Sequence, residues 1–98
     1  MIRGTTARII FLVNIDTDDI TTAYVTFQSN SVTFEKSYSD LEFEEGKIIA
    51  NLTQADTLRF SGDETVKVQL RAKLSDGEAI ASPIKNLRVG DILKDGEI

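Results

Sequence analysis

The sequence contains no cysteine, no histidine and no tryptophan, and it has a single proline. Without cysteine, neither a disulfide framework nor a thiolate zinc site can form. The absence of histidine removes the commonest general base and metal ligand, so only carboxylates, lysines, tyrosines and hydroxyls remain for chemistry. The sequence also lacks a phosphate-binding loop, a dinucleotide fingerprint and a serine elbow. We therefore expect a protein that is not an enzyme and that uses no cofactor.

Long apolar runs and an excess of positive charge are also missing. The longest purely apolar run, Ile9–Val13, is too short for a membrane span or for the core of a signal peptide. The formal net charge of −5 disfavours nucleic acid and anionic lipid, because both bind through neutralisation of phosphates by Lys and Arg. We expect no nucleic-acid or membrane partner. The expected localisation is cytoplasmic on synthesis, and virion-associated if a larger assembly incorporates the chain.

What is present is typical of one small globular domain. The 98 residues are 41% hydrophobic and 28% charged, and no linker or internal repeat divides them. We expect a single domain over residues 1–98, with residues 1–6 as an N-terminal arm and residues 91–98 as a C-terminal tail.

The dominant pattern is alternation of apolar and polar side chains. It is clearest in Thr65–Leu74, where apolar residues at even positions alternate with polar residues at odd positions. A period of two is that of a half-buried strand, and we interpret this segment as the central one. Similar short segments with turns between them give about seven strands, the pattern of a two-sheet antiparallel β-sandwich.

The first strand differs from the others because it is apolar on nearly both faces. In residues 9–15 the odd positions are all apolar, and Ile10 and Leu12 make most of the opposite face apolar as well. Such a strand is either covered on both sides or presents its second face to another subunit.

A helical turn is predicted near residues 53–58. The Thr53 hydroxyl can cap an amide three residues on, and the Asp56 carboxylate can reach back to the start of the turn. The segment Leu52–Thr57 resembles the helical turn between the fifth and sixth strands of immunoglobulin-type domains. We therefore expect an immunoglobulin-like all-β fold, although the cysteines and tryptophan of true immunoglobulin domains are missing.

The last strand is expected over Ala79–Val89, with a change of parity. Ile80, Ser82 and Ile84 form its first inward set, and Leu87 and Val89 form the second, which predicts a bulge near Lys85–Asn86. Pro83 lacks a backbone N–H, so one side of this strand should be an edge.

Two groups of residues are candidates for ligand binding. Asp16, Asp18 and Asp19 are weak candidates for calcium ligands at the 14–19 loop, although their spacing lacks the glycine and the distant glutamate of a helix-loop-helix calcium site. Tyr24 is the tyrosine on an outward parity that could stack on a sugar. The plainer interpretations are a solvated turn for the aspartates and cover for a neighbouring strand for Tyr24.

Protein contact has more candidates. Exposed aliphatic surface on a small domain usually meets a partner, and the residues we expect at such an interface are Ile10, Leu12, Tyr24, Ile92 and Leu93. A basic stripe of Lys67, Arg71 and Lys73 could dock an acidic partner. The alternative is a solvated face in which these cations pair across strands with Glu35 or another acid.

Several segments resemble small, mostly uncharacterised proteins encoded in phage and prophage regions of Gram-positive bacteria. They are Met1–Thr6 (MIRGTT), Leu52–Leu58, Val68–Arg71 and Asp76–Ala79. Proteins of that group are expected to have proline after the threonine pair, and this sequence has Ala7 there. The resemblance implies a virion-associated or prophage-encoded structural role, and it transfers no functional residue.

Two functions follow as hypotheses. The first is a structural or interaction module, phage tail- or baseplate-associated, whose partner is a second copy of the chain or a larger phage structural protein. The second is a β-sandwich that binds calcium or a carbohydrate at the loop end around residues 14–19. An enzyme would need convergent carboxylates with perturbed acidity in a pocket.

Overall fold

The predicted central strand, β6 (Thr65–Leu74), lies in the middle of the larger of two antiparallel sheets in the computed structural model, which describes residues 1–98. Its even-numbered side chains from Val66 to Ala72 are buried and its odd-numbered ones face outward, as the alternation predicts. The other strands of this sheet are β2 (Ile20–Gln28), β3 (Thr33–Ser37), β7 (Ala79–Ala81) and β8 (Lys85–Arg88).

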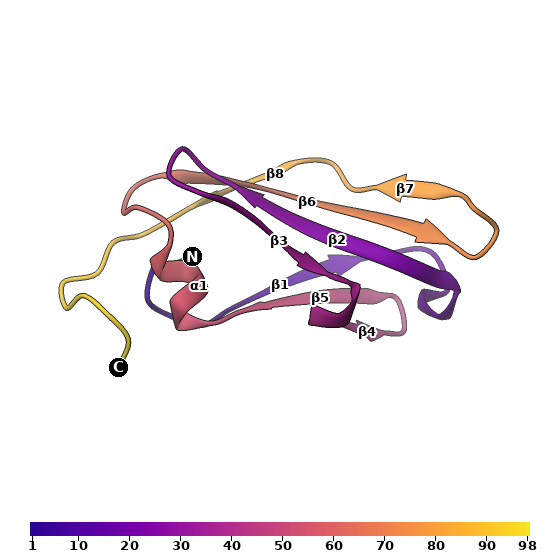
Figure 1. The fold of residues 1–98 in the computed structure, drawn as a ribbon, viewed down its shortest axis with the longest axis horizontal. Coiled ribbons are helices and arrows are strands. Elements are labelled where there is room, and N and C mark those ends of the chain that lie inside the picture. Colours follow the sequence, from indigo (N-terminus) through magenta and orange to yellow (C-terminus); the bar gives the residue numbers. More distant parts are fainter.

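The smaller sheet packs face to face on the larger one (Figure 1). It consists of β1 (Ala7–Leu12), β4 (Leu41–Glu44) and β5 (Lys47–Leu52), in the order β1-β5-β4. The larger sheet has the order β3-β2-β6-β7, and β8 pairs with β6 beyond the end of β7. The all-β sandwich is confirmed, and its partition of strands is that of an immunoglobulin-like domain in which β1, β5 and β4 take the places of strands B, E and D.

The core lies between the two sheets, and aromatic side chains stack at one end of it. The ring of Phe34 stacks on Phe27 and on Phe60, with centroid distances of 5.2 and 5.5 Å. The Arg59 guanidinium lies 4.4 Å from the centroid of the Phe34 ring, a cation–π contact that covers this end of the core. A chain without cysteine depends on this packing for its stability.

The predicted helical turn is confirmed as α1 (Gln54–Leu58). Asp56 donates its backbone N–H to the Thr53 hydroxyl (3.1 Å), and the Asp56 carboxylate accepts the Thr53 N–H (2.9 Å). The Lys36 ammonium group also forms an ion pair with this carboxylate, at 2.8 Å. Burial raises the pKa of Asp56, but the hydrogen bonds and the lysine outweigh burial and lower the pKa overall.

Two short 3-10 turns, η1 (Thr17–Asp19) and η2 (Tyr38–Asp40), complete the helical structure. No helix of the protein has the length and apolar character to cross a bilayer.

The N-terminal arm is held against the end of the sandwich near α1. The Arg3 guanidinium donates to the carbonyls of Phe60 (3.0 Å) and Leu58 (3.4 Å), and Arg3 also pairs with Asp95 in the C-terminal tail at 3.2 Å. The buried Thr57 hydroxyl donates to the Thr5 carbonyl at 2.7 Å. The arm therefore connects α1 to the tail. Its sequence has no periodic pattern from which these contacts could be predicted.

The final strand is where the structure corrects the sequence prediction. Ala81 pairs with Arg71 and Lys85 pairs with Val68, so β7–β8 has one residue more than β6 over this stretch. The bulge therefore lies at Pro83–Ile84 and not near Lys85–Asn86, because Pro83 has no N–H to continue the ladder. As a result Ile84 points outward, 58% exposed, instead of joining the inward set with Ile80 and Ser82.

We predict that Thr57→Val lowers the free energy of unfolding by about 1–3 kcal/mol, because it leaves the Thr5 carbonyl without its donor while it keeps the shape of the side chain. Urea denaturation measures this loss. Thr6→Val, at an exposed residue of the same arm, is the matched control and should be nearly neutral. Equal effects of the two substitutions would contradict the role given to the buried hydroxyl.

Glu64 provides a prediction for acid pH. Burial raises its pKa, but hydrogen bonds from Ser31, from the Ser61 N–H and from Ser29 together outweigh burial and lower the pKa to about 2. Because the folded-state pKa lies below the ordinary 4.5, the stabilisation is complete above pH 4.5 and is lost as the pH falls toward about 2.

We therefore predict that Glu64→Gln lowers the melting temperature at pH 7 by a few degrees, since about 1 kcal/mol corresponds to about 4–8 °C for a domain of this size. The difference from the unmodified protein should shrink between pH 4.5 and about 2. Calorimetry over this range measures it. The control is Glu35→Gln, an exposed carboxylate on β3, and a pH-independent loss for Glu64→Gln would contradict the assignment.

Candidate docking groove

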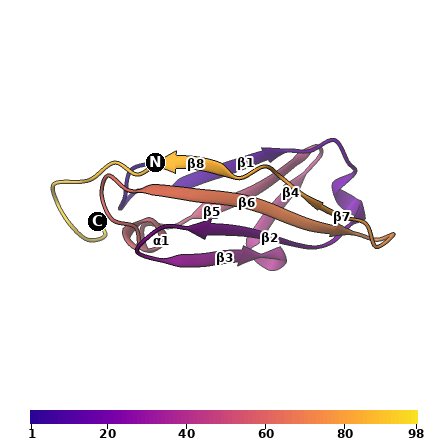
Figure 2. The same cartoon turned by 90° about the horizontal axis from the view of Figure 1, so that it is seen from above.

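One long side of the sandwich lies between the edge of β1 and the edge formed by β7 and β8 (Figure 2). The side chains on this side leave a hollow. The hollow is a groove of about 560 Å³, and 11 of its 15 lining residues are hydrophobic. β1 and the loop after it supply residues 9–15 of the lining, and the other lining residues come from β6 and from residues 80–87 along the last two strands. In an immunoglobulin-like sandwich the place beside strand B is taken by strand A, and here no strand occupies it.

The backbone of β1 faces this groove with unpaired groups. The Val13 N–H donates to the Gly46 carbonyl at 2.9 Å, so the odd-numbered residues of β1 bond toward β5. Hydrogen-bonding direction alternates along an antiparallel strand, so the N–H and C=O groups of Arg8, Ile10 and Leu12 point toward the open side. The only strand that pairs with β1 is β5. The edge can therefore accept another strand.

From Ile9 to Leu12, the side chains of β1 are apolar at this edge. Ile10 is 46% and Leu12 is 80% exposed on the outer face, next to Ile49, which is fully buried. Ile9 and Val13 are half-buried on the inner face and line the groove. The first strand is thus not covered on both sides, and its second face is open.

The opposite wall is shaped by the bulge. The Ser82 hydroxyl accepts the Leu70 N–H at 3.0 Å, in the place of a ladder carbonyl, and donates to the Pro83 carbonyl at 3.0 Å. The Gln69 side chain donates to the Ser82 carbonyl at 3.0 Å. These bonds satisfy the backbone groups that are left unpaired where the ladder of β6 is interrupted, between its pairing with β7 and its pairing with β8.

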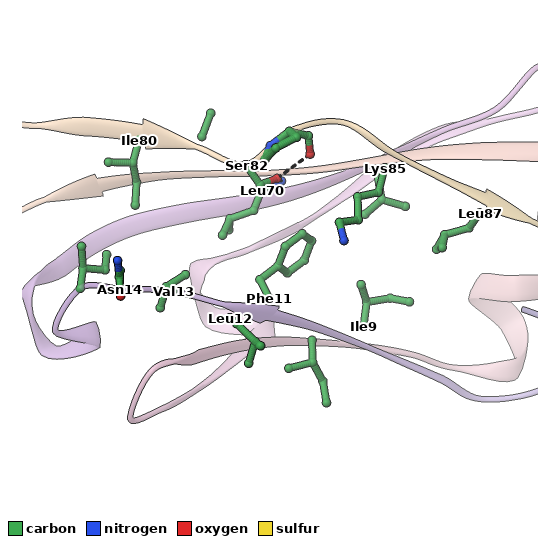
Figure 3. A pocket seen from close by; sticks show the side chains of 15 residues that line it. Ile9, Phe11, Leu12, Val13, Asn14, Leu70, Ile80, Ser82, Lys85 and Leu87 are labelled. Atoms are coloured by element: carbon green, nitrogen blue, oxygen red, sulfur yellow. Dashed lines mark hydrogen bonds between the residues drawn. The ribbon is translucent and has the colours of Figure 1, made fainter.

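Lys85 is the one charged residue that lines the groove. The bulge turns this side chain inward, and in Figure 3 its ammonium group reaches from β8 into the space above Phe11. Lys85 forms none of the four salt bridges of the protein. A positive charge without a partner therefore lies over an apolar floor.

The N-terminal arm closes the neighbouring part of this side. Gly90 donates its N–H to the Met1 carbonyl (2.7 Å), and the Gly90 carbonyl accepts the Arg3 N–H (3.0 Å), so the arm runs parallel to the end of the last strand. The groove begins beyond this contact, which leaves β7 and the bulge uncovered.

The structure brings together two of the five predicted interface residues. Ile10 and Leu12 line the groove. Tyr24 is 43% exposed on the outer face of the larger sheet, paired in register with Arg71. Ile92 is half-buried against Gly4, and Leu93 is fully exposed in the tail beyond α1.

The candidate calcium ligands lie at the loop end of the sandwich. Asp16 caps η1, where its carboxylate accepts the Asp18 N–H at 3.0 Å. Asp16 and Asp18 share a polar depression with Glu44 and Glu45, and Asp19 lies outside its lining. No group of three or more acidic side chains is arranged to hold a metal ion.

The basic stripe is present on the outer face of β6. Lys67, Arg71 and Lys73 alternate with buried residues, and none of the three takes part in a salt bridge. Glu35 pairs in register with Thr26 on β2, one strand away from β6, so the expected pairing across adjacent strands does not form.

Comparison with known proteins adds no family to this description. No protein-family model matches the chain, and neither a curated protein nor a solved structure shows significant similarity to it. The groove is therefore the feature of this protein from which we infer its function.

Sequence reasoning missed Lys85 as a groove residue. It placed the bulge two residues too late, which left Lys85 outside the inward set. The available signal was Pro83, because a proline inside an otherwise regular strand is the position at which a ladder is most easily interrupted.

We predict that Ser82→Ala destabilises the protein by about 1–3 kcal/mol, because the Leu70 N–H loses its acceptor beneath the bulge. Amide hydrogen exchange should show faster exchange at Leu70, and urea denaturation should show the loss of stability. Ser39→Ala, at an exposed serine, is the control for both measurements. Unchanged exchange at Leu70 would contradict the hydrogen bond.

Proposed function

We propose that this protein is a non-enzymatic structural or interaction module that acts through protein–protein contacts. The observation that carries the proposal is the open side of the sandwich, where unpaired backbone groups of β1 and the exposed side chains of Ile10 and Leu12 adjoin an apolar groove. Exposed edge strands and apolar patches are normally hidden by proteins that work as monomers, so a surface that combines both is expected to have a partner.

The kind of assembly is proposed from the sequence resemblance, which points to phage or prophage structural proteins, with tail or baseplate as the location. The segments that carry the resemblance contain residues with structural contacts, such as Arg3 and Thr57. A rigid small module with one open side suits a component that is held in place by a larger structural protein. Its localisation is proposed as cytoplasmic on synthesis and virion-associated after assembly.

The alternative proposal, a module that binds calcium or a carbohydrate, has less support. The Asp16 carboxylate is occupied as a helix cap, and Asp19 does not share the depression of Asp16 and Asp18. Tyr24 lies between Ser37 and Arg71 on the outer face of the larger sheet, and neither of these neighbours is aromatic. A thermal-shift screen with calcium and common glycans tests this alternative through stabilisation of the native state.

We predict that the protein is incorporated in phage particles at a fixed stoichiometry. Particles released from the source strain after prophage induction would be purified on a density gradient and quantified by mass spectrometry. The protein should co-sediment with tail or baseplate components and withstand a high-salt wash. Its presence in the soluble lysate alone, with none in the particles, would contradict the proposed role.

A further inference from the structure

We propose that the groove accepts an extended segment of a partner protein, which adds a strand beside β1 and places a carboxylate against Lys85. This inference rests on the proposed function, because it specifies how the interaction module binds and the chemistry of what it binds. The mode is strand addition, in which backbone hydrogen bonds supply affinity and alternate side chains supply specificity.

The two edges of the smaller sheet differ in a way that favours β1 as the binding edge. On β4, the outer face carries Glu42 and Glu44, both exposed, and charge on an edge strand discourages pairing with another chain. On β1, the equivalent positions on the other side of β5 are occupied by Ile10 and Leu12. The edge with charge is protected, and the edge with aliphatic side chains is open.

The backbone of β1 determines the geometry of the added strand. The outward N–H and C=O groups of Arg8, Ile10 and Leu12 would form hydrogen bonds with the bound segment. The segment would then be a fourth strand of the smaller sheet, next to β1, in the place that strand A occupies in immunoglobulin domains. The six residues of β1 span about 20 Å at about 3.4 Å per residue. A segment of about this length covers the groove from the arm to the loop after β1.

The side chains of the groove specify the chemistry of the segment. Its inward residues would pack on the half-buried Ile9, Val13, Ile80 and Leu87, so they should be aliphatic. An outward aliphatic residue would cover Ile10 or Leu12. Lys85, an exposed residue, is the only charge in the groove and has no ion-pair partner, so an acidic residue in the segment would complement it.

A second copy of the chain fits this requirement less well. Its own β1 has no acidic residue, so it would bring no carboxylate to Lys85. Its C-terminal tail has acidic residues, but Ile98 donates its N–H to the Gln54 side chain at 2.8 Å and Asp95 pairs with Arg3, so the tail is engaged on its own domain. The occupant we assign is therefore a different protein.

The test uses a display library of random peptides, selected on the full chain. We expect enrichment of peptides that alternate aliphatic residues and contain at least one acid. On binding of a selected peptide, NMR hydrogen exchange should show new protection of the Arg8, Ile10 and Leu12 amides. Absence of enrichment, or protection at other amides only, would overturn the inference.

Two groove variants, each with a matched control, separate the contributions. Leu12→Pro removes an N–H that points to the groove and leaves the ladder to β5 intact, and it should weaken peptide binding by about tenfold or more relative to Leu12→Thr, which keeps the N–H. Lys85→Glu should weaken the binding of acidic peptides by about tenfold. Lys67→Glu, the same charge change on the outer face of β6, should leave this binding unchanged. Binding that survives both groove variants, with the fold verified by circular dichroism, would overturn the inference.

The outcomes distinguish this inference from the proposed function. Incorporation of the Leu12→Pro variant into particles at the normal level would reject strand addition while the structural role stands. Peptide binding at β1 by a protein that is absent from particles would reject the phage role and support the groove. Protection of the β1 amides on concentration alone, without peptide, would identify a second copy as the occupant and overturn the choice of partner.

Discussion

Each strand edge of a β-sandwich presents backbone N–H and C=O groups that must be paired, covered or left in water, and this constraint organises the whole molecule. The core itself is secured by the facing apolar sets of β2, β5 and β6, with the stacked rings of Phe27, Phe34 and Phe60 at one end. The edges are treated individually. β4 is protected by glutamates, and the end of the last strand is covered by Met1–Arg3.

Of the two edges of the smaller sheet, β1 has no glutamate and no neighbouring strand on its open side: Ile10 and Leu12 are exposed on its outer face, and Arg8 at its start is its one charged residue. Two features of the larger sheet extend this opening into a groove: the bulge at Pro83–Ile84 interrupts the opposite strand, and the arm stops at Gly90. The hydrogen bonds of Ser82 make the bulge a stable element, since they replace the missing ladder contacts. The open side is thus built into the fold, because its floor is core and its walls are strands.

The need to pair backbone groups also explains why the two ends of the chain matter to a small domain. Arg3 connects the arm to the carbonyls that end α1 and to the tail, and Thr57 connects α1 back to the arm. These contacts satisfy carbonyls that the end of a short helix leaves free. The terminal segments act as parts of the sandwich, and the interaction surface is on its flank.

The sequence by itself determined the elements whose signals are local. Alternation identified β6 and the inward face of β1, the Thr53–Asp56 pair identified α1, and the doubly apolar character of residues 9–13 singled out Ile10 and Leu12. Only the tertiary structure decided which edge remained open, where the bulge shifted the parity, and that Lys85 turned into the groove while Tyr24 and Leu93 lay elsewhere. The physical reason is that strand neighbours and ladder register are long-range properties, set by the pairing of segments distant in the chain, and a local pattern of side chains carries no record of them.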